Sequence, residues 1–567
     1  MARKVFISVI GTGFYSECVY KIGEFRSDTT RFIQQATLQM LTQQKVGGEW
    51  TKNDQIYIVL TEKAKEYNWD IPSGKRYNPK DKKDEPYIGL KSALEQMSLP
   101  TPIKTIDIPD GNNERELWDI FDKIYTVFEN GDELYFDLTH GFRYLPMMVL
   151  VLGNYAKFLK NTIVKSIAYG NYESRDKETN IAPIINITPL AALQDWTNAA
   201  ADYLEHGDAT KLKNCADKPL ITIARETKGQ DQDATTLIKL SKQLYEFSNL
   251  ISFNRGDEII IGKQSEQIKA LLEKADAEYI RPMGPLFKQI AKSVRNFNPD
   301  SPENMIEASR LCLDHSDFQA SITLLQEGIV SMLCRKFHLD VKDKGDREIA
   351  TQALNKLGLE LQNKEYRPLS PYKETIIKRI IDSGIISSEL ANQWNKITED
   401  RNDFNHAGLR ASYKDAETLR NNISSYLSAV CDEISAIKAY VPGTPPLLVN
   451  LSNHPYKDWS EDQKKAAEKY GDVQDMAFPE IDPAMKIDKI KKEIAAAQID
   501  EIKNMCKERR VTVHIMGEMS YTFYVVSQLK AFGIRCICST SERDTEDLGG
   551  GEKKVTFRFK RFRDYDC

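Results

Sequence analysis

Two short polar segments of the chain each follow an apolar run that is typical of a β-strand. Gly11-Thr12-Gly13 follows the first run, and a later one is followed by Thr139, His140, Gly141 and Arg143. Glycine lets backbone N–H groups approach phosphate oxygens, and Thr, His and Arg side chains at a helix start donate hydrogen bonds to phosphate or ribose oxygens. Because open α/β sheets bind ligands at the carboxyl ends of their strands, the two segments together predict a nucleotide site. For Gly11-Thr12-Gly13 alone, a plain tight turn is the alternative.

A second candidate site lies in a helical region and combines Arg401, Asn402 and His406. RNA is cleaved without a metal when the ribose 2′-hydroxyl attacks its own phosphate, and an imidazole with a pKa near 6.5 can move the protons of that reaction. Arg401 would stabilise the charge on the phosphate, and Asn402 would orient either partner. Positions five apart on a helix diverge, so a shared site needs a helix end, which Gly408 predicts. The alternative is an exposed helix with a chance ion pair or cap.

A third set of polar residues follows apolar runs near the end of the sequence, and comprises Ser452, Asn453, His454, Glu518, Ser541 and Arg543. Ser541 and Arg543 are expected in a segment that follows the run Ile534–Cys538. Hydroxyl, amide, imidazole and carboxylate groups at strand ends can bind a nucleotide or carry out acid–base chemistry. A binding or dimerisation module without chemistry is the alternative.

The hydrophobic pattern predicts three domains that would position these residues. Residues 1–190 alternate short apolar strands with helical stretches, which predicts an α/β Rossmann-like domain with a parallel sheet. Residues 191–440 show only helical periodicity and predict an all-α domain, in which Glu327 could orient the active site in a neighbouring helix, although we expect it to be solvated. The Pro- and Gly-rich residues 441–446 predict a linker, and residues 447–567 return to a small α/β pattern.

Composition limits the possible classes of protein. The 567 residues are too many for one hydrophobic core, and the chain has no apolar run long enough to span a bilayer. Nine scattered cysteines without zinc-ligand or redox spacing predict a reducing compartment, which we expect to be the cytoplasm, and neither a structural metal nor a cofactor. The net charge of −5 argues against tight, sequence-independent binding to long nucleic acid, so any RNA contact should be local.

The first two loops also carry a family resemblance. Together with the Asp137-x-Thr139-His140-Gly141 sequence and the later Tyr169–Glu173 segment, Gly11-Thr12-Gly13 resembles the CARF domain of CRISPR-associated proteins. The resemblance implies binding of a ring-shaped oligoadenylate across a two-fold dimer interface, with tetra-adenylate favoured over hexa-adenylate. By that resemblance the ligand-binding residues are Gly11, Thr12, Gly13, Thr139, His140, Gly141 and Arg143.

The remaining two regions resemble parts of the same defence systems. A helical domain with an Arg-x4-His motif after a CARF-like sensor resembles the HEPN ribonucleases, which implies Arg401, Asn402 and His406 as catalytic residues of a homodimer or higher oligomer. The segment from Leu447 onward resembles small CRISPR accessory proteins, some of which are ring nucleases. These resemblances imply a cyclic-oligoadenylate-activated, metal-independent endoribonuclease for single-stranded RNA in type III CRISPR antiviral defence, with a C-terminal domain that binds or cleaves the activator.

Two other functions compete with this interpretation. A non-catalytic oligoadenylate sensor that recruits a partner has the same first domain, and the two functions differ in whether His406 is needed. An ordinary dinucleotide-binding redox enzyme is disfavoured, because the Gly11-Thr12-Gly13 loop is not followed by the third glycine or by the expected acidic ribose-binding residue.

Overall fold

The computed structural model describes residues 2–44, 46, 48–141, 144–217, 219–274, 283–362, 364–549 and 552–565. The chain divides into two compact units, Met1–Asn198 and Ala199–Cys567. The second unit therefore contains both the helical region and the C-terminal α/β region that the sequence pattern separates. No helix in the described residues is both long and apolar enough to cross a membrane.

The first unit is built on an eight-stranded sheet with the order β3-β2-β10-β9-β8-β1-β4-β7. Five neighbouring strands are parallel and agree with the short apolar strands predicted for this domain: β1 (Lys4–Val9), β4 (Gln55–Leu60), β7 (Ile103–Asp107), β8 (Glu133–Asp137) and β9 (Ile163–Gly170). Every residue of β1 is buried, as expected for a parallel strand that is covered on both faces. The chain proceeds from β1 outward through β4 to β7, and then returns to the other side of β1 with β8.

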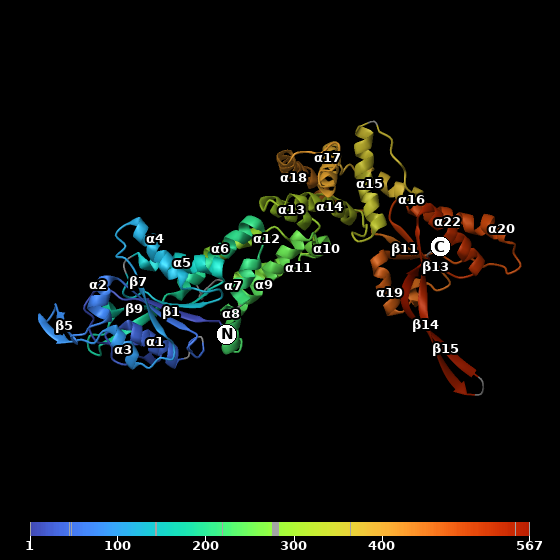
Figure 1. Cartoon of the computed structure of the whole chain (residues 1–567). Helices are drawn as coiled ribbons and strands as arrows, with labels where there is room; N and C mark the ends of the chain where they lie inside the picture. The colour runs from blue at the N-terminus through green and yellow to red at the C-terminus, as the bar shows by residue number, and fades with distance from the viewer. Residues whose placement is uncertain are drawn as a thin grey trace. The chain divides into compact units, whose positions relative to one another are not determined.

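Helices cover both faces of this sheet, as Figure 1 shows. The helices α1 (Ile33–Gln43) and α3 (Leu90–Gln96) share one apolar core with alternate strand residues such as Phe6. On the other face, α4 (Glu114–Thr126) and α5 (Leu145–Lys160) pack with Val5 and its neighbours. Successive side chains of a strand point to opposite faces of the sheet, so each strand contributes to both cores. This arrangement of helices on both faces of a sheet is the α/β architecture that the sequence predicts.

Three strands on the far side of β9 were not predicted. They are β2 (Val19–Ile22), β3 (Phe25–Arg26) and β10 (Ile181–Asn186), with a separate hairpin of β5 (Lys75–Asn78) and β6 (Lys83–Pro86). The last two strands are mostly exposed and charged, so they lack the apolar pattern on which a sequence-based prediction depends.

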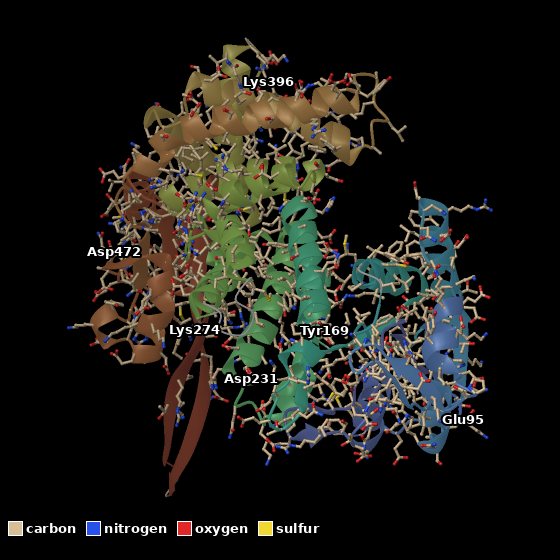
Figure 2. The ribbon with its side chains drawn as sticks, turned by 90° about the vertical axis from the view of Figure 1, so that its left-hand side faces the viewer. Glu95, Tyr169, Asp231, Lys274, Lys396 and Asp472 are labelled. Atoms are coloured by element: carbon tan, nitrogen blue, oxygen red, sulfur yellow. The ribbon has the colours of Figure 1, made fainter. Side chains whose placement is uncertain are left out.

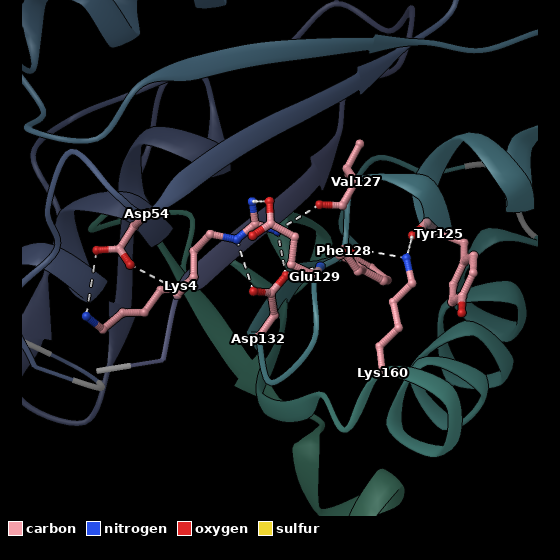
Figure 3. A network of polar contacts seen from close by, with 9 residues as sticks. Lys4, Asp54, Tyr125, Val127, Phe128, Glu129, Asp132 and Lys160 are labelled. Carbon is pink, nitrogen blue, oxygen red and sulfur yellow. Dashed lines mark hydrogen bonds and ion pairs between the residues drawn. The ribbon is translucent and has the colours of Figure 1, made fainter.

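A polar network fixes the amino-terminal ends of the central strands, opposite the loops that follow their carboxyl ends (Figure 3). The Arg3 guanidinium donates two hydrogen bonds, of 3.0 and 2.7 Å, to the Asp132 carboxylate. Asp132 is 1% exposed and also accepts a hydrogen bond of 2.7 Å from the backbone N–H of Glu129. Both carboxylate oxygens are therefore satisfied in a buried position.

We expect Asp132→Asn to lower the free energy of unfolding of the first unit by about 2 kcal/mol, because the amide leaves Arg3 without its full charge partner. Asp70→Asn is the control, since Asp70 pairs with Lys91 at 3.2 Å on the exposed surface and should change stability by less than about 1 kcal/mol. Urea unfolding measures the free energy of unfolding of both variants. Equal effects would contradict the stabilising role of the buried Asp132–Arg3 pair.

The helical part of the second unit begins within α6 (Thr188–His206) and includes α7 (Thr210–Asp217), α8 (Pro219–Glu226), α9 (Gln232–Ser252), α10 (Gly256–Ile261), α11 (Lys263–Lys274), α12 (Gly284–Val294), α13 (Asn304–Asp314), α14 (Phe318–Lys336), α15 (Lys344–Leu361), α16 (Pro371–Asp382), α17 (Ser388–Asn405) and α18 (Ala416–Ala439). The predicted helical character is confirmed. The most buried helix is α14, which packs against α13, α15, α17 and α18.

The C-terminal part is a five-stranded sheet with the order β12-β11-β13-β14-β15. Its strands are β11 (Leu447–Ser452), β12 (Asp472–Asp475), β13 (Val511–Met516), β14 (Arg535–Gly549) and β15 (Glu552–Asp564), and the first four in spatial order are parallel. Its main helices are α19 (Glu461–Ala467), α21 (Ala496–Met505) and α22 (Met519–Phe532).

One expectation for this sheet is wrong. The run Ile534–Cys538 does not end at Cys538, because β14 continues to Gly549 in a long antiparallel pair with β15. Figures 1 and 2 show this hairpin extending beyond the rest of its sheet. Ser541 and Arg543 therefore lie inside a strand, on an exposed ribbon, and not in a loop at a strand end.

The helical bundle and the C-terminal sheet share one apolar core, which includes residues of α14–α18 together with β11, β13 and α22. Polar contacts reinforce this packing. The Tyr372 hydroxyl accepts a hydrogen bond of 3.1 Å from Val511 N and lies 3.4 Å from Val511 O, and Arg510 forms a 2.6 Å ion pair with Asp346. The predicted linker, residues 441–446, thus joins two regions that share one packed core.

Candidate functional sites

The first candidate site lies where the strand order of the N-terminal sheet reverses. The crevice between β1 and β8 is such a switch point, since β4 lies on the far side of β1 and β9 on the far side of β8. Open α/β sheets bind ligands there. The loops that begin at Gly11 and Thr139 leave these two strands, so the structure brings both predicted loops together. Arg143 lies outside the described residues.

The buried carboxylate of Asp137 organises the second loop. It accepts hydrogen bonds from Ser8 Oγ at 2.6 Å and from Thr139 Oγ1 at 2.5 Å, and Thr139 Oγ1 in turn accepts one of 2.8 Å from the backbone N–H of Gly170. Burial raises the pKa of Asp137 above its ordinary value, and the bonds from Ser8 and Thr139 oppose that rise. The hydroxyl of Thr139 therefore joins β8 to β9, while the Asp137 carboxylate joins β8 to β1.

His140 and Gly11 make the contact between the two loops. The His140 ring stacks on Tyr15 with 4.0 Å between ring centroids, and the Tyr15 hydroxyl accepts a hydrogen bond of 3.0 Å from Gly11 N. A Cβ on Gly11 would come within 3.1 Å of the His140 carbonyl oxygen, so this close approach favours a glycine. Burial lowers the pKa of His140 to about 4, and its Nε2 is buried without a hydrogen-bond partner in the described structure. A neutral imidazole with a free nitrogen is suited to a nucleotide hydrogen bond.

Two residues that the sequence analysis missed hold the first loop. Asn68 Nδ2 donates to the carbonyl oxygens of Gly11 and Gly13 at 2.7 and 2.9 Å. Arg76 donates to those of Thr12 and Gly13 at 2.7 and 2.9 Å, and thus reaches the loop from the β5–β6 hairpin. With the carbonyls engaged, the exposed Thr12 and Gly13 are held in a defined loop. No spacing in the sequence links these positions, which are more than fifty residues apart.

The second candidate site lies at the end of α17. Arg401 and Asn402 are in its last turns, and the helix ends at Asn405 with His406 as its C-cap. Ala407 and Gly408 then adopt left-handed backbone conformations, so the predicted helix end is present. The His406 side chain is exposed, and no hydrogen bond joins it to Arg401 within the described residues of one chain.

Glu327 of α14 fixes the Arg401 side chain. Glu327 Oε1 lies 3.3 Å from Arg401 Nη2, and its other oxygen accepts a hydrogen bond from Arg347. The Glu327 side chain is 34% exposed, so it is partly solvated, and its contact with Arg401 agrees with the alternative that it orients this site from a neighbouring helix. Arg401 Nε is buried without a hydrogen-bond partner among the described residues, but the side chain as a whole is 29% exposed. An arginine that is held in one place and reaches the surface is suited to binding a phosphate.

Buried acids next to Arg401 set the orientation of α17. Asp400 is fully buried and accepts hydrogen bonds from Asn422 and Tyr426 at 2.8 and 2.9 Å, as well as an ion pair from Lys414. Asp400 therefore faces the core of the bundle. Its neighbour Arg401 lies at the margin of that core and is partly exposed.

The third set of predicted residues is not brought together. Ser452 donates a hydrogen bond of 2.8 Å to Asn450 Oδ1, whereas Asn453 and His454 are exposed. Glu518 caps α22 by accepting from the N–H groups of its first residues, and these bonds lower the pKa of Glu518. The buried polar centre of this domain is instead His514, which the sequence analysis did not select.

His514 should make stability depend on pH. Burial lowers its pKa to about 4, whereas an imidazole in the unfolded chain titrates near 6.5. The unfolded chain therefore binds the proton first as pH falls, and stability that is present above pH 6.5 is lost towards pH 4. We expect about 2 kcal/mol of loss between pH 7.5 and 5 in the wild-type chain relative to His514→Gln. Denaturant unfolding at the two pH values measures this difference, and parallel pH curves would contradict it.

Comparisons with known proteins give three family matches along the chain. Residues 5–173 match the model for the CARF domain of the CRISPR system endoribonuclease Csx1. Residues 192–301 match the second domain of the CRISPR-associated protein MJ1674, and residues 446–563 match the uncharacterized protein MJ1673 family. The Arg401–His406 segment lies between the second and third of these matches.

Two individual proteins are similar over longer stretches. CRISPR-associated protein MJ1674 of Methanocaldococcus jannaschii is 22% identical over 275 residues, which cover 48% of this chain and 39% of that protein. The chain thus aligns with less than half of that relative. The structure of Enterococcus italicus Csm6 bound to cyclic hexa-2′-fluoro-hexa-dAMP aligns with 77% of this chain and 94% of its own, at 13% identity and a TM-score of 0.34. From the family matches and this relative, we conclude that the chain begins with a CARF domain similar to that of Csx1, and that the regions after it are similar to parts of other CRISPR-associated proteins.

Proposed function

We propose that this protein is a cyclic-oligoadenylate-activated endoribonuclease that cleaves single-stranded RNA in type III CRISPR antiviral defence. The observation that carries the proposal is the meeting of two phosphate-compatible loops at the β1–β8 switch point, within a segment that matches the CARF domain of an endoribonuclease. The ring would bind over Thr12, Gly13 and His140. We favour cyclic tetra-adenylate as the activator.

The proposed cleavage site is of the HEPN type and uses Arg401 and His406 without a metal. His406 moves protons to and from the ribose oxygens, and Arg401, held by Glu327, stabilises the charge on the phosphate. The two side chains do not contact each other in one chain, so we place the complete site between two copies that each contribute both residues.

An exposed apolar face on α5 supports pairing with a second copy. Met147, Val151 and Phe158 are 72%, 61% and 84% exposed, and their spacing places them on one face of the helix with Tyr155. An apolar stripe of this kind is typical of a protein interface. A two-fold pairing of CARF domains would cover it and would place two ring-binding loops in one assembly.

The test is cleavage of a labelled single-stranded RNA, in the presence of a chelator, with no ring, cyclic tetra-adenylate or cyclic hexa-adenylate. We expect cleavage only with a ring, and none from His406→Ala. His206→Ala is the control, because His206 is exposed on α6 and pairs only with Asp202 in the described structure. Ring binding without cleavage would overturn the nuclease proposal and favour an adaptor that recruits a partner.

A further inference from the structure

A row of alternating charges connects the C-terminal sheet to the proposed cleavage residue Arg401. Arg510, the residue before β13, forms a 2.6 Å ion pair with Asp346 in the first turn of α15. The next residue of α15, Arg347, bonds to Glu327 of α14, and Glu327 pairs in turn with Arg401 of α17 at 3.3 Å. Within the second unit, the row thus runs from the C-terminal sheet to the end of α17.

Arg510 anchors the loop between α14 and α15. Its Nη1 donates a hydrogen bond of 3.0 Å to the carbonyl oxygen of His338, while its Nη2 makes the ion pair with Asp346. The Asp346 carboxylate also accepts a hydrogen bond of 2.8 Å from Asp340 N, so one guanidinium holds two points of the loop, one directly and one through Asp346. Asp346 is 7% exposed, and burial raises its pKa whereas Arg510 opposes that rise. A charged carboxylate in this buried position therefore depends on Arg510.

The same loop holds the Arg347 side chain. Arg347 Nη1 donates hydrogen bonds of 3.1 Å to the carbonyl oxygen of Val341 and to Ser331 Oγ. Its Nη2 reaches one oxygen of Glu327, and the other oxygen of Glu327 is the one that contacts Arg401. Arg347 therefore keeps Glu327 from using both oxygens on Arg401, which leaves part of the Arg401 guanidinium for a phosphate.

Loss of Arg510 would disturb this arrangement from its far end. A buried carboxylate without a charge partner is costly, so the loop would shift to let water reach Asp346. The loop carbonyl that holds Arg347 would move with it. Glu327 would then be free to turn both oxygens toward Arg401 in a bidentate pair, which uses the donors that a phosphate needs.

We propose that Arg510 is a positioning residue for RNA cleavage, and that the C-terminal sheet acts through it on Arg401. The sheet would then hold the helical bundle in the form that cleaves, in addition to sharing its core. For the role of Arg401 in cleavage, the inference rests on the proposed function. It assigns the C-terminal region a part in cleavage that needs no nucleotide bound there.

The first experiment measures single-turnover RNA cleavage by the full chain with Arg510→Met, at saturating RNA and ring. We expect the rate to fall about tenfold while the dissociation constants for RNA and ring stay within about twofold, because the contact is needed for chemistry and not for binding. Arg509→Met is the matched control and should cleave within about twofold of wild type, since Arg509 is the neighbouring residue but pairs with Asp472 of its own sheet at 2.7 Å. A wild-type rate in a folded Arg510→Met chain would overturn the proposal.

A second variant covers the case in which Arg510→Met does not fold. Arg510→Gln combined with Asp346→Asn removes both charges of the pair, so no unpaired carboxylate is left buried. We expect a thermal midpoint close to that of wild type but a cleavage rate that is about threefold lower, because the shorter glutamine cannot reach the loop at both places that the guanidinium holds. An unchanged rate in this chain would also contradict the role of Arg510.

A double-mutant cycle separates this route from a general loosening of the bundle. Glu327→Gln cannot form a charged bidentate pair with Arg401, so adding Arg510→Met to it should slow cleavage by less than about twofold. If the full loss caused by Arg510→Met persisted in the Glu327→Gln chain, Arg510 would act by another route and the proposal would be wrong.

Hydrogen–deuterium exchange tests the structural link without relying on RNA cleavage. Arg510→Met should speed exchange in residues 338–343 and in the last turn of α17, whereas Arg509→Met should speed neither. Faster exchange at both places in a chain that never cleaves RNA would overturn the proposed ribonuclease while supporting the link. Unchanged exchange at the end of α17, in a chain that does cleave RNA, would overturn the link alone.

Discussion

Arg401→Ala should reduce the rate of ring-activated RNA cleavage by about a hundredfold or more, because it removes the guanidinium that Glu327 holds in the last turns of α17, five residues before His406. Arg401→Lys should restore little of this rate, since an ammonium cannot keep the Glu327 contact and also present a planar pair of donors to phosphate. Single-turnover cleavage at saturating RNA and ring measures the effect on chemistry.

Arg335→Ala is the matched control for this loss. Arg335 lies on α14 with Glu327 but pairs with Asp300 on the surface, at 2.5 Å, so its removal should leave cleavage within about twofold of the wild-type rate. Full activity of Arg401→Ala would show that α17 does not form the cleavage site. Equal losses in both variants would indicate a general effect of surface charge.

Phe158→Glu should convert the proposed dimer to monomers and abolish RNA cleavage in the same variant. Phe158 is 84% exposed on the apolar face of α5, and a carboxylate there would have to be desolvated in a two-fold interface beside its own copy. Because the proposed cleavage site needs two copies, loss of the dimer should remove activity although Arg401 and His406 are unchanged. Sedimentation velocity and the RNA cleavage assay measure the two effects.

Phe253→Glu controls for the addition of a charge to an exposed aromatic position. Phe253 is 66% exposed at the end of α9, outside the α5 face. The Phe253→Glu variant should leave both the mass of the assembly and the rate of RNA cleavage unchanged. A monomeric Phe158→Glu chain that still cleaves RNA at the wild-type rate would contradict a cleavage site shared between copies.

The parts of the fold that were predicted from sequence are those with a strong apolar pattern. The strands β1, β4 and β8 are runs of buried Val, Ile, Leu and aromatic residues, so local sequence was enough to identify them. By contrast, β12 has the sequence Asp-Val-Gln-Asp and is mostly exposed, so only its pairing with β11 makes it a strand. The length of β14 was missed for the same reason, since its distal half is charged and pairs only with β15.

In the candidate sites, too, only the features with a local sequence signal were predicted. Loops at strand ends and the end of α17 were predicted because glycine and the apolar period mark them locally. The contacts of Arg76 with Thr12, of Glu327 with Arg401 and of Asn450 with His514 each join positions more than sixty residues apart. They depend on which elements lie side by side, and the spacing of residues in one sequence contains no such information.

The shared core between the helical bundle and the C-terminal sheet determines how this chain would respond to being cut. A protease that cleaved between Val441 and Pro446 would break only the covalent connection, because the Tyr372–Val511 and Arg510–Asp346 contacts and the common apolar core would remain. The two fragments should therefore stay bound as a noncovalent complex and separate only in denaturant. Truncating the gene at the same point would instead expose that core, so the C-terminal region is a structural part of the bundle and not a removable appendage.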